Sequence, residues 1–389
     1  MLAFTAARLL SPTNRVELPL VLVEERRVAE ISARDGRELP SGVSLVDFGD
    51  AMIAPGYVDL HIHGSAGFDV MDDAAEGLPT IERFLTGHGV TSYFPTTVTA
   101  SMERTLGALE RLADAIEERE RPNTRGGAGA APLGIHLEGP FISHARRGVH
   151  PPEDLLLPTP GLFRKFWDAA RGRIRMITIA PELEGALEVI AEAARLGVCV
   201  SLGHSDADYA AAERGIDAGA RHATHTFNAM RPLDHRSPGI LGAVLTDRRV
   251  STDMIVDGVH IDPAVVKLIA EAKGPELTVL ITDAISATGM PEGRYHLGGF
   301  EVDVHDGKCM LNGRLAGSVL TLDRAVRNLG RFAEWELPQA IAAASQNPAR
   351  VAQIPNKGVL AKGADADFVV LDNEGEVLRT FIGGVECSR

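Results

Sequence analysis

Hydrophobic and polar positions follow different patterns at the start of the chain and in its middle. Up to about residue 52 the sequence holds short alternating segments, separated by turn-forming Pro, Asn, Asp and Gly, at 3–10, 18–23, 27–31 and 43–48. From Ile53 onward, apolar runs alternate with amphipathic stretches of helical period, which is typical of βα units and a parallel sheet. The pattern therefore predicts a β-rich start followed by a large α/β unit.

Eight apolar runs are predicted to be the strands of this α/β unit. They lie at 53–61, 90–95, 133–138, 174–180, 198–204, 222–225, 250–256 and 277–283. The helices expected between them include 102–120, 183–195, 209–218 and 263–272. Eight strands with mostly intervening helices favour a (β/α)8 barrel of the TIM type over an open doubly wound sheet.

The last part of the chain shows the same short β segments as its beginning. Two helical patterns at 319–334 and 338–344 follow the eighth strand, and the tail then reads as β at 358–360, 367–371 and 377–382. Because the first and last segments are both β-rich, we infer that they fold together. The predicted organisation is a small β-sandwich domain of residues 1–52 and 357–389 beside a barrel domain of residues 53–356.

Composition and charge narrow the classes of protein to consider. The hydrophobic fraction of 45% and charged fraction of 24% are ordinary for a globular protein, which argues against disorder. A net charge of −14 disfavours a nucleic-acid or membrane-surface binder, because such a protein needs a basic face. No apolar run approaches the roughly 18 residues of a membrane span. The three cysteines are far apart and odd in number, so no disulfide framework is indicated and a cytoplasmic location is expected.

Two histidines end the first predicted strand of the barrel. Side chains alternate across a strand, so His61 and His63, spaced i, i+2, project to the same side. Two imidazoles aimed at one point form half of a metal site. A lone pair of this kind is more often structural, so the argument depends on what lies at the ends of the other strands.

Metal-capable side chains also end four further predicted strands. In a barrel the carboxyl ends of the strands converge on one mouth, where active sites are found. The residues at these ends, with the two histidines, are His61, His63, Glu138, His204, His225 and Asp283. Imidazole and carboxylate ligands suit zinc or another divalent transition metal, which activates water as a nucleophile. Asp283 is placed to take up and deliver the proton, so metal-assisted hydrolysis of a C–N or ester bond is the predicted reaction class.

Four loop residues near this mouth are further candidates. His150 follows the third strand and could polarise a substrate carbonyl, and His260 follows the seventh. Asn228 and neighbouring backbone amides follow the sixth strand and could bind an anion, while Arg236 could pair with a phosphate. On spacing alone, exposed loop histidines and a solvated arginine remain the alternatives.

Several motifs resemble one known family in order along the chain. They are PGYVDLHIHG (55–64), HLEGPF (136–141), LGHS (202–205), THTFNAM (224–230), DGVH (257–260), TDA (282–284) and LAGS (315–318). Together they resemble the N-acetylglucosamine-6-phosphate deacetylase family of the amidohydrolase superfamily. The match extends to SQNPA at 345–349, and the KGADAD segment at 362–367 is also similar to the superfamily.

The resemblance implies a role for each group of site residues. It implies that Glu138, His204 and His225 bind the main metal, that His61 and His63 add a second, and that Asp283 is the general acid/base. One or two divalent ions per subunit are expected, with zinc preferred and iron or manganese as alternatives. Catalytic His150 and the substrate-binding residues complete the implied set: Val149, Asn228, Ala229, Arg236, Asp257, His260, Leu315, Ala316 and Gly317.

The resemblance also implies a substrate and an assembly. The phosphorylated amino sugar N-acetyl-D-glucosamine 6-phosphate would lose its acetyl group as acetate. In the family, the arginine at the position of Arg236 reaches the active site of the neighbouring subunit, so a homodimer is expected. Two rival readings remain open on sequence grounds: the same chemistry on N-acetylgalactosamine 6-phosphate, and a catalytically silent barrel used for binding.

Overall fold

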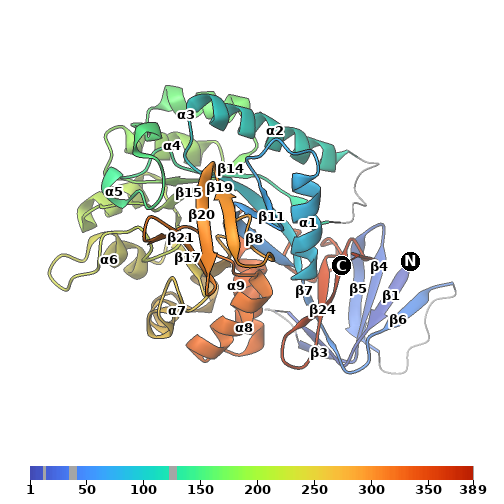
Figure 1. Cartoon of the computed structure of the whole chain (residues 1–389). Helices are drawn as coiled ribbons and strands as arrows, with labels where there is room; N and C mark the ends of the chain where they lie inside the picture. Colours follow the sequence, from blue (N-terminus) through green and yellow to red (C-terminus); the bar gives the residue numbers. More distant parts are fainter. Residues whose placement is uncertain (12–14, 35–41, 122–128, 389) are drawn as a thin grey trace.

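A barrel of parallel strands forms the centre of the molecule (Figure 1). The computed structural model describes residues 1–11, 15–34, 42–121 and 129–388. Within these residues the barrel strands are β8 (Tyr57–Ile62), β11 (Val90–Thr97), β13 (Ile135–Glu138), β14 (Ile174–Ile179), β15 (Cys199–Leu202), β16 (His222–Ala223), β17 (Ser251–Ile255) and β18 (Thr278–Ile281). Each pairs in parallel with the next, and a parallel bridge between Ile62 and Ala284 joins the first strand to the segment after the last. The predicted TIM-like barrel is confirmed.

Helices pack around the barrel, most with one buried face and one exposed face. They are α1 (Gly77–Gly87), α2 (Met102–Glu120), α3 (Pro160–Ala169), α4 (Ala186–Arg195), α5 (Tyr209–Ala218), α6 (Gly239–Thr246), α7 (Pro263–Leu277), α8 (Leu322–Ala333), α9 (Leu337–Ala344) and α10 (Gln346–Val351). Helix α2 shows why they form: the Ser101 side chain caps its first turn, and Thr105, Ala108, Leu109 and Leu112 form one buried face at helical spacing. Burying each such leucine contributes roughly 1.5–3 kcal/mol.

Strands from both ends of the chain form a small β unit, where both termini also lie (Figure 1). One sheet has the order β5-β4-β1-β6 and the other β25-β24-β23-β7-β2-β3. Their bounds are β1 (Leu2–Thr5), β2 (Arg8–Leu10), β3 (Arg15–Glu17), β4 (Pro19–Glu24), β5 (Arg27–Ala33), β6 (Ser44–Asp47), β7 (Met52–Pro55), β23 (Phe368–Leu371), β24 (Val377–Ile382) and β25 (Val385–Glu386). Phe4, Phe368 and Phe381 pack in the core of this unit, the last two with stacked rings 4.5 Å apart. The exact division into residues 1–52 plus 357–389 and 53–356 stays a prediction.

The predicted first barrel strand, 53–61, is two strands in the structure. Strand β7 pairs with β2 and β23 in the small β unit, and β8 enters the barrel after Gly56. A side chain at position 56 would overlap Thr91, so only glycine lets the chain pass at this point. The expectation of one continuous strand was therefore wrong, because a single apolar run serves two sheets in succession.

A four-stranded antiparallel sheet, absent from the sequence prediction, follows β18. It comprises β19 (Gly293–Leu297), β20 (Phe300–His305), β21 (Lys308–Leu311) and β22 (Arg314–Leu315), and it has a core of its own beside the barrel. Two of its turns, Asp306-Gly307 and Asn312-Gly313, have positive φ at both residues. Asp-Gly and Asn-Gly between short β segments are the strongest local hairpin signals, and they could have revealed this sheet. No helix in the described parts of the chain is long and apolar enough to cross a membrane.

Candidate functional site

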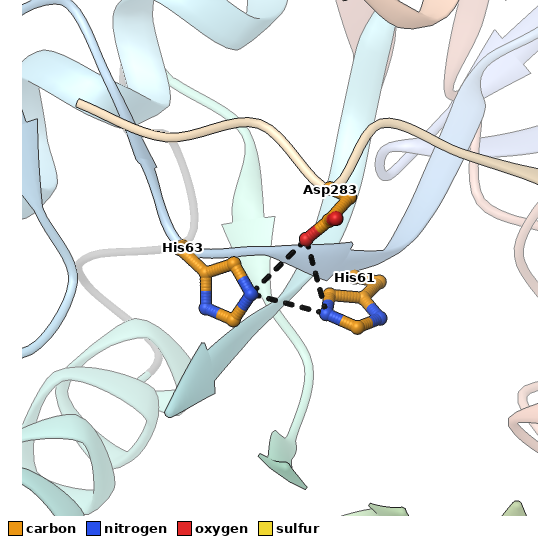
Figure 2. Close-up of side chains that lie close together, drawn as sticks. All are labelled: His61, His63 and Asp283. Atoms are coloured by element: carbon orange, nitrogen blue, oxygen red, sulfur yellow. Dashed lines mark hydrogen bonds and ion pairs between the residues drawn. The ribbon is translucent and has the colours of Figure 1, made fainter. Parts of the chain in front are cut away.

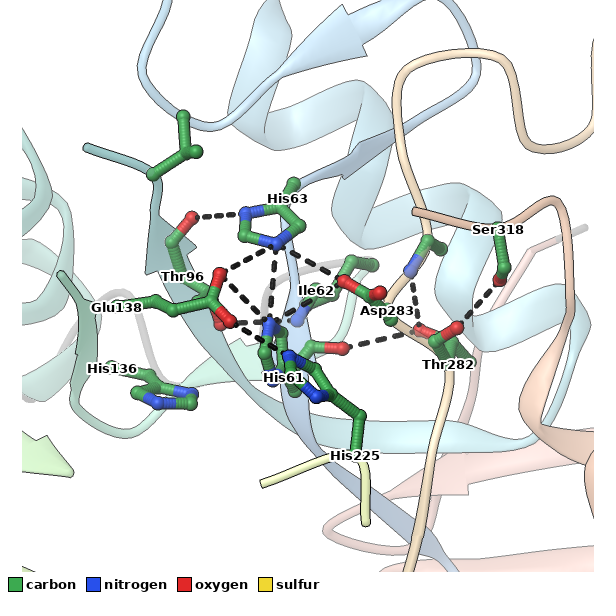
Figure 3. A network of polar contacts seen from close by, with 12 residues as sticks. His61, Ile62, His63, Thr96, His136, Glu138, His225, Thr282, Asp283 and Ser318 are labelled. Carbon is green, nitrogen blue, oxygen red and sulfur yellow. Dashed lines mark hydrogen bonds and ion pairs between the residues drawn. The ribbon is translucent and has the colours of Figure 1, made fainter. Parts of the chain in front are cut away.

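The metal-capable side chains predicted at the strand ends come together at one mouth of the barrel, with Glu138 at their centre (Figure 3). One carboxylate oxygen, Oε1, lies 3.2 Å from His204 Nε2 and 3.1 Å from His225 Nε2. The other, Oε2, lies 3.4 Å from His61 Nε2 and 3.3 Å from His63 Nε2. Glu138 is therefore shared by two groups of ligand atoms, one on each side of its carboxylate.

Asp283 completes the second of these groups (Figure 2). Its Oδ1 lies 3.1 Å from His63 Nε2 and 3.4 Å from His61 Nε2, and the two Nε2 atoms are 3.1 Å apart. All three side chains are buried. Nitrogen and oxygen atoms that face one another this closely are the donor set of a divalent transition metal.

The buried carboxylates of Glu138 and Asp283 carry negative charge that a bound cation would balance. All ion pairs described for Glu138 and Asp283 are with histidines. Burial alone would raise the pKa of Asp283, but the charge of His61 and a hydrogen bond from His63 hold it at about 2. Burial likewise opposes ionisation of Glu138, yet its histidine neighbours keep its pKa well below the usual range. Among the described residues, these two buried carboxylates have only histidines as counter-charges, which fits a metal centre because a bound cation supplies further positive charge.

The outer nitrogens of two histidines fix which ring nitrogen faces the centre. His63 donates from Nδ1 to the backbone oxygen of Thr96 at 3.0 Å, and His204 donates from Nδ1 to that of Arg146 at 2.9 Å. A carbonyl only accepts, so Nδ1 carries a proton and Nε2 is the nitrogen that faces the carboxylates. When Nε2 carries no proton, each ring can offer a metal a lone pair at this nitrogen, beside Glu138.

Three of the site residues lie just beyond the strands that were predicted to contain them. Strand β15 ends at Leu202, β16 at Ala223 and β18 at Ile281, and the left-handed backbone of His204, His225 and Asp283 follows, with φ of 45°, 29° and 50°. Such a backbone costs about 1–3 kcal/mol for a residue with a side chain and is concentrated at functional sites. The left-handed turn ends the strand and aims the side chain into the mouth.

Two buried aspartates that the sequence analysis missed support this geometry. Asp59 accepts hydrogen bonds from the His61 amide at 3.2 Å and the Thr282 hydroxyl at 2.6 Å, which ties β8 to the segment that carries Asp283. Asp253 accepts the amide of His225 and lies 2.9 Å from His222 Nε2. Asp59 stands two positions before His61, so its place on the inward face of the strand was readable from the period of two.

A cavity of about 200 Å³ opens beside the metal-capable residues. Seven of the predicted substrate residues line it: Val149, His150, Asn228, Ala229, His260, Leu315 and Gly317. Leu297 of the unpredicted antiparallel sheet lines it as well, together with Val98 and Ile255. The mouth is thus enclosed partly by the barrel loops and partly by the added sheet.

The other three predicted substrate residues do not line the cavity. Asp257 accepts a 2.7 Å hydrogen bond from His260 Nδ1 and holds that ring in place. Ala316 is buried in the core of the antiparallel sheet. Arg236 is exposed on the loop before α6, where its described hydrogen bond is from its amide to Asp234. The described lining contains no lysine or arginine.

Comparisons with known proteins agree with this geometry. The model of the amidohydrolase family matches residues 52–387. N-acetylglucosamine-6-phosphate deacetylase from Lysinibacillus sphaericus is 35% identical, with 92% of this chain and 91% of that protein covered. N-acetylgalactosamine-6-phosphate deacetylase from Escherichia coli O157:H7 is 39% identical, with coverage of 89% and 90%. A solved mutant of the Mycobacterium smegmatis N-acetyl-D-glucosamine-6-phosphate deacetylase, in complex with N-acetyl-D-glucosamine-6-phosphate, has a TM-score of 0.92 at 36% identity and covers 100% of this chain and 99% of its own.

Proposed function

Because the chain belongs to the amidohydrolase family, we propose that it removes the acetyl group of N-acetyl-D-glucosamine 6-phosphate, releasing D-glucosamine 6-phosphate and acetate. The observation that carries the proposal is the pair of ligand groups sharing Glu138 at the edge of a cavity that also holds Asp283 and His150. The similarity to deacetylases over nine-tenths of the chain supports the choice of substrate.

The residues present fit one or two divalent cations. Glu138, His204 and His225 would hold the main ion, and His61 and His63 a second, with zinc preferred over iron or manganese. When bound, such an ion polarises a carbonyl and lowers the pKa of water, so that water can act as a nucleophile at neutral pH. Its positive charge would also replace the protons that the buried carboxylates otherwise draw onto the histidines.

Asp283 is the group that would move the proton. It stays ionised across the working pH range, because its histidine neighbours hold its pKa at about 2 against the effect of burial. An ionised carboxylate at the cavity wall can accept a proton from attacking water and donate it to the amide nitrogen as the C–N bond breaks. Without that proton the nitrogen would leave as a strongly basic anion, so cleavage of the C–N bond needs this proton.

His150 would hold the acetyl oxygen. Burial, together with the charge of neighbouring histidines, lowers the pKa of His150 to about 3, so the ring is neutral. A neutral imidazole can donate one N–H to a carbonyl oxygen on which negative charge develops. The position of His150 in the cavity wall, 3.7 Å from Glu138, places this donor beside the proposed metal centre.

The 6-phosphate needs a positive partner that the described cavity wall does not supply. Asn228 offers a buried side-chain nitrogen with no hydrogen-bond partner among the described residues, yet an amide carries no charge. Arg236 is exposed and does not line the cavity of its own subunit. We propose that Arg236 serves the site of a second subunit and that the protein is a homodimer.

Acetate release tests the proposal. The purified protein, loaded with zinc, is given N-acetyl-D-glucosamine 6-phosphate and, separately, its galactosamine epimer, each with and without a chelator. A higher kcat/KM on the glucosamine substrate, lost with chelator and restored by metal, is expected. The E. coli relative favours the epimer as the second candidate, and a higher kcat/KM on it would select that activity. No acetate from either sugar would support a binding protein instead.

A further inference from the structure

His150 belongs to a cluster that could be read as a third set of metal ligands. Ligand atoms of Glu138, His150 and His204 all lie within 4.8 Å of one another, and the rings of the two histidines are 4.7 Å apart. Proximity alone therefore allows two roles for His150: a ligand that offers a lone pair, or a donor that offers an N–H. The position of its ring proton decides between them.

Thr99 settles the position of that proton. The backbone N–H of Thr99 points at His150 Nδ1 at 3.3 Å, and the Thr99 hydroxyl lies 2.8 Å from the same nitrogen. A backbone amide only donates, so Nδ1 must be the acceptor and the proton of the neutral ring must be on Nε2. This is the reverse of His63 and His204, whose Nδ1 atoms face carbonyl oxygens.

Gly139 leaves room for the contact between Thr99 and His150. Thr99 is buried just beyond the end of β11, and its hydroxyl lies directly over Gly139, where any side chain would overlap it. Gly139 also has a φ of 75°, which a residue with a side chain rarely adopts. The glycine next to the central carboxylate of Glu138 thus makes room for the group that fixes the neighbouring ring.

We propose that Thr99 is a positioning residue that holds His150 with its proton on Nε2, so that His150 donates to the acetyl oxygen of the substrate and does not bind metal. The inference rests on the proposed deacetylation for the identity of the acceptor. The tautomer itself is a property of the free protein and depends only on the contacts of Thr99 with Nδ1.

Two substitutions separate this role from a general effect on packing. Thr99→Val keeps the shape and the backbone N–H but removes the hydroxyl, and Thr99→Ser keeps the hydroxyl. We expect Thr99→Val to lower kcat by roughly 3- to 10-fold, the range for one neutral hydrogen bond, with little change in KM or metal content. Thr99→Ser should retain most of the rate. In a His150→Gln background, Thr99→Val should cause no further loss, because its effect passes through His150.

Nitrogen NMR of the zinc-loaded protein with labelled histidine measures the tautomer directly, with the His150 signals identified by their loss in His150→Gln. An unprotonated Nδ1 and a protonated Nε2 are expected. A protonated Nδ1, a fall in metal content in Thr99→Val, or an equal loss of rate in the His150→Gln background would overturn the proposal. Failure of the wild-type protein to release acetate would instead refute the proposed function, since the tautomer measurement needs no substrate. The NMR measurement also needs no Thr99 variant, so it tests the proposed tautomer of His150 even if Thr99→Val fails to fold.

Discussion

Replacing Asp283 by asparagine is the sharpest test of the proposed chemistry. Asparagine keeps the volume of the side chain and one oxygen near His61 and His63, but it cannot accept a proton at neutral pH. A positioned general acid/base contributes about 10²- to 10⁴-fold to a rate, which corresponds to roughly 2.7–5.4 kcal/mol of activation free energy. We therefore expect kcat to fall by this factor while KM changes little.

The metal content of the variant separates proton transfer from ligand loss. The main ligand group of Glu138, His204 and His225 does not include Asp283, so elemental analysis should still find the main ion. Asp208→Asn is a matched control, because this exposed aspartate caps α5 and asparagine caps helices equally well. A value of kcat within tenfold of wild type, or a loss of rate that added zinc restores, would show that Asp283 does not carry the proton.

Three further predictions concern metal, assembly and pH. His61→Ala should lower the bound metal towards one ion per subunit, whereas His204→Ala should lose the main ion; elemental analysis after dialysis distinguishes them, and equal losses would contradict the two-group assignment. Arg236→Ala should raise KM at least tenfold, and mixing it with Asp283→Asn should restore activity through hybrid dimers that contain one intact site; no recovery after subunit exchange would argue against a shared site. Burial lowers the pKa of Lys273 from 10.5 to about 8, so between these values the unfolded chain binds more protons and stability rises with pH. Lys273→Met should remove this rise, of order 1–2 kcal/mol, which thermal melts of both proteins at about pH 7 and about pH 10 would detect; identical pH dependence would refute it.

The barrel could be predicted from the sequence because its signals are local. Apolar runs of strand length, separated by helical patterns, predict parallel strands without knowledge of the partners. The convergence of His61, Glu138 and Asp283 then follows from topology, since the carboxyl ends of barrel strands share one mouth. This is why residues far apart in the sequence could be assigned to one centre before any distance was known.

Other features depend on the backbone or on contacts between distant segments, and they were missed. The left-handed turns at His204 and His225 place these residues outside the strands, and a positive φ is too uncommon even for histidine to be predicted from the sequence. The support that Asp253 gives to His225 requires β16 and β17 to be neighbours. The contact between Thr99 and His150 joins two loops, and no spacing rule connects them. The antiparallel sheet, by contrast, carried readable Asp-Gly and Asn-Gly turns.

The passage of the chain through Gly56 connects the small β unit directly to the strand that carries His61. Upstream of this glycine, Ile53 and Ala54 pair with Val370 and Val369 of β23, and downstream the same segment leads directly to His61. The last strands of the chain therefore anchor the segment that carries His61, a proposed ligand of the second metal. Shortening the chain from its C-terminal end would release that anchor, so a fragment limited to the barrel would be expected to lose second-site metal before it lost its helices.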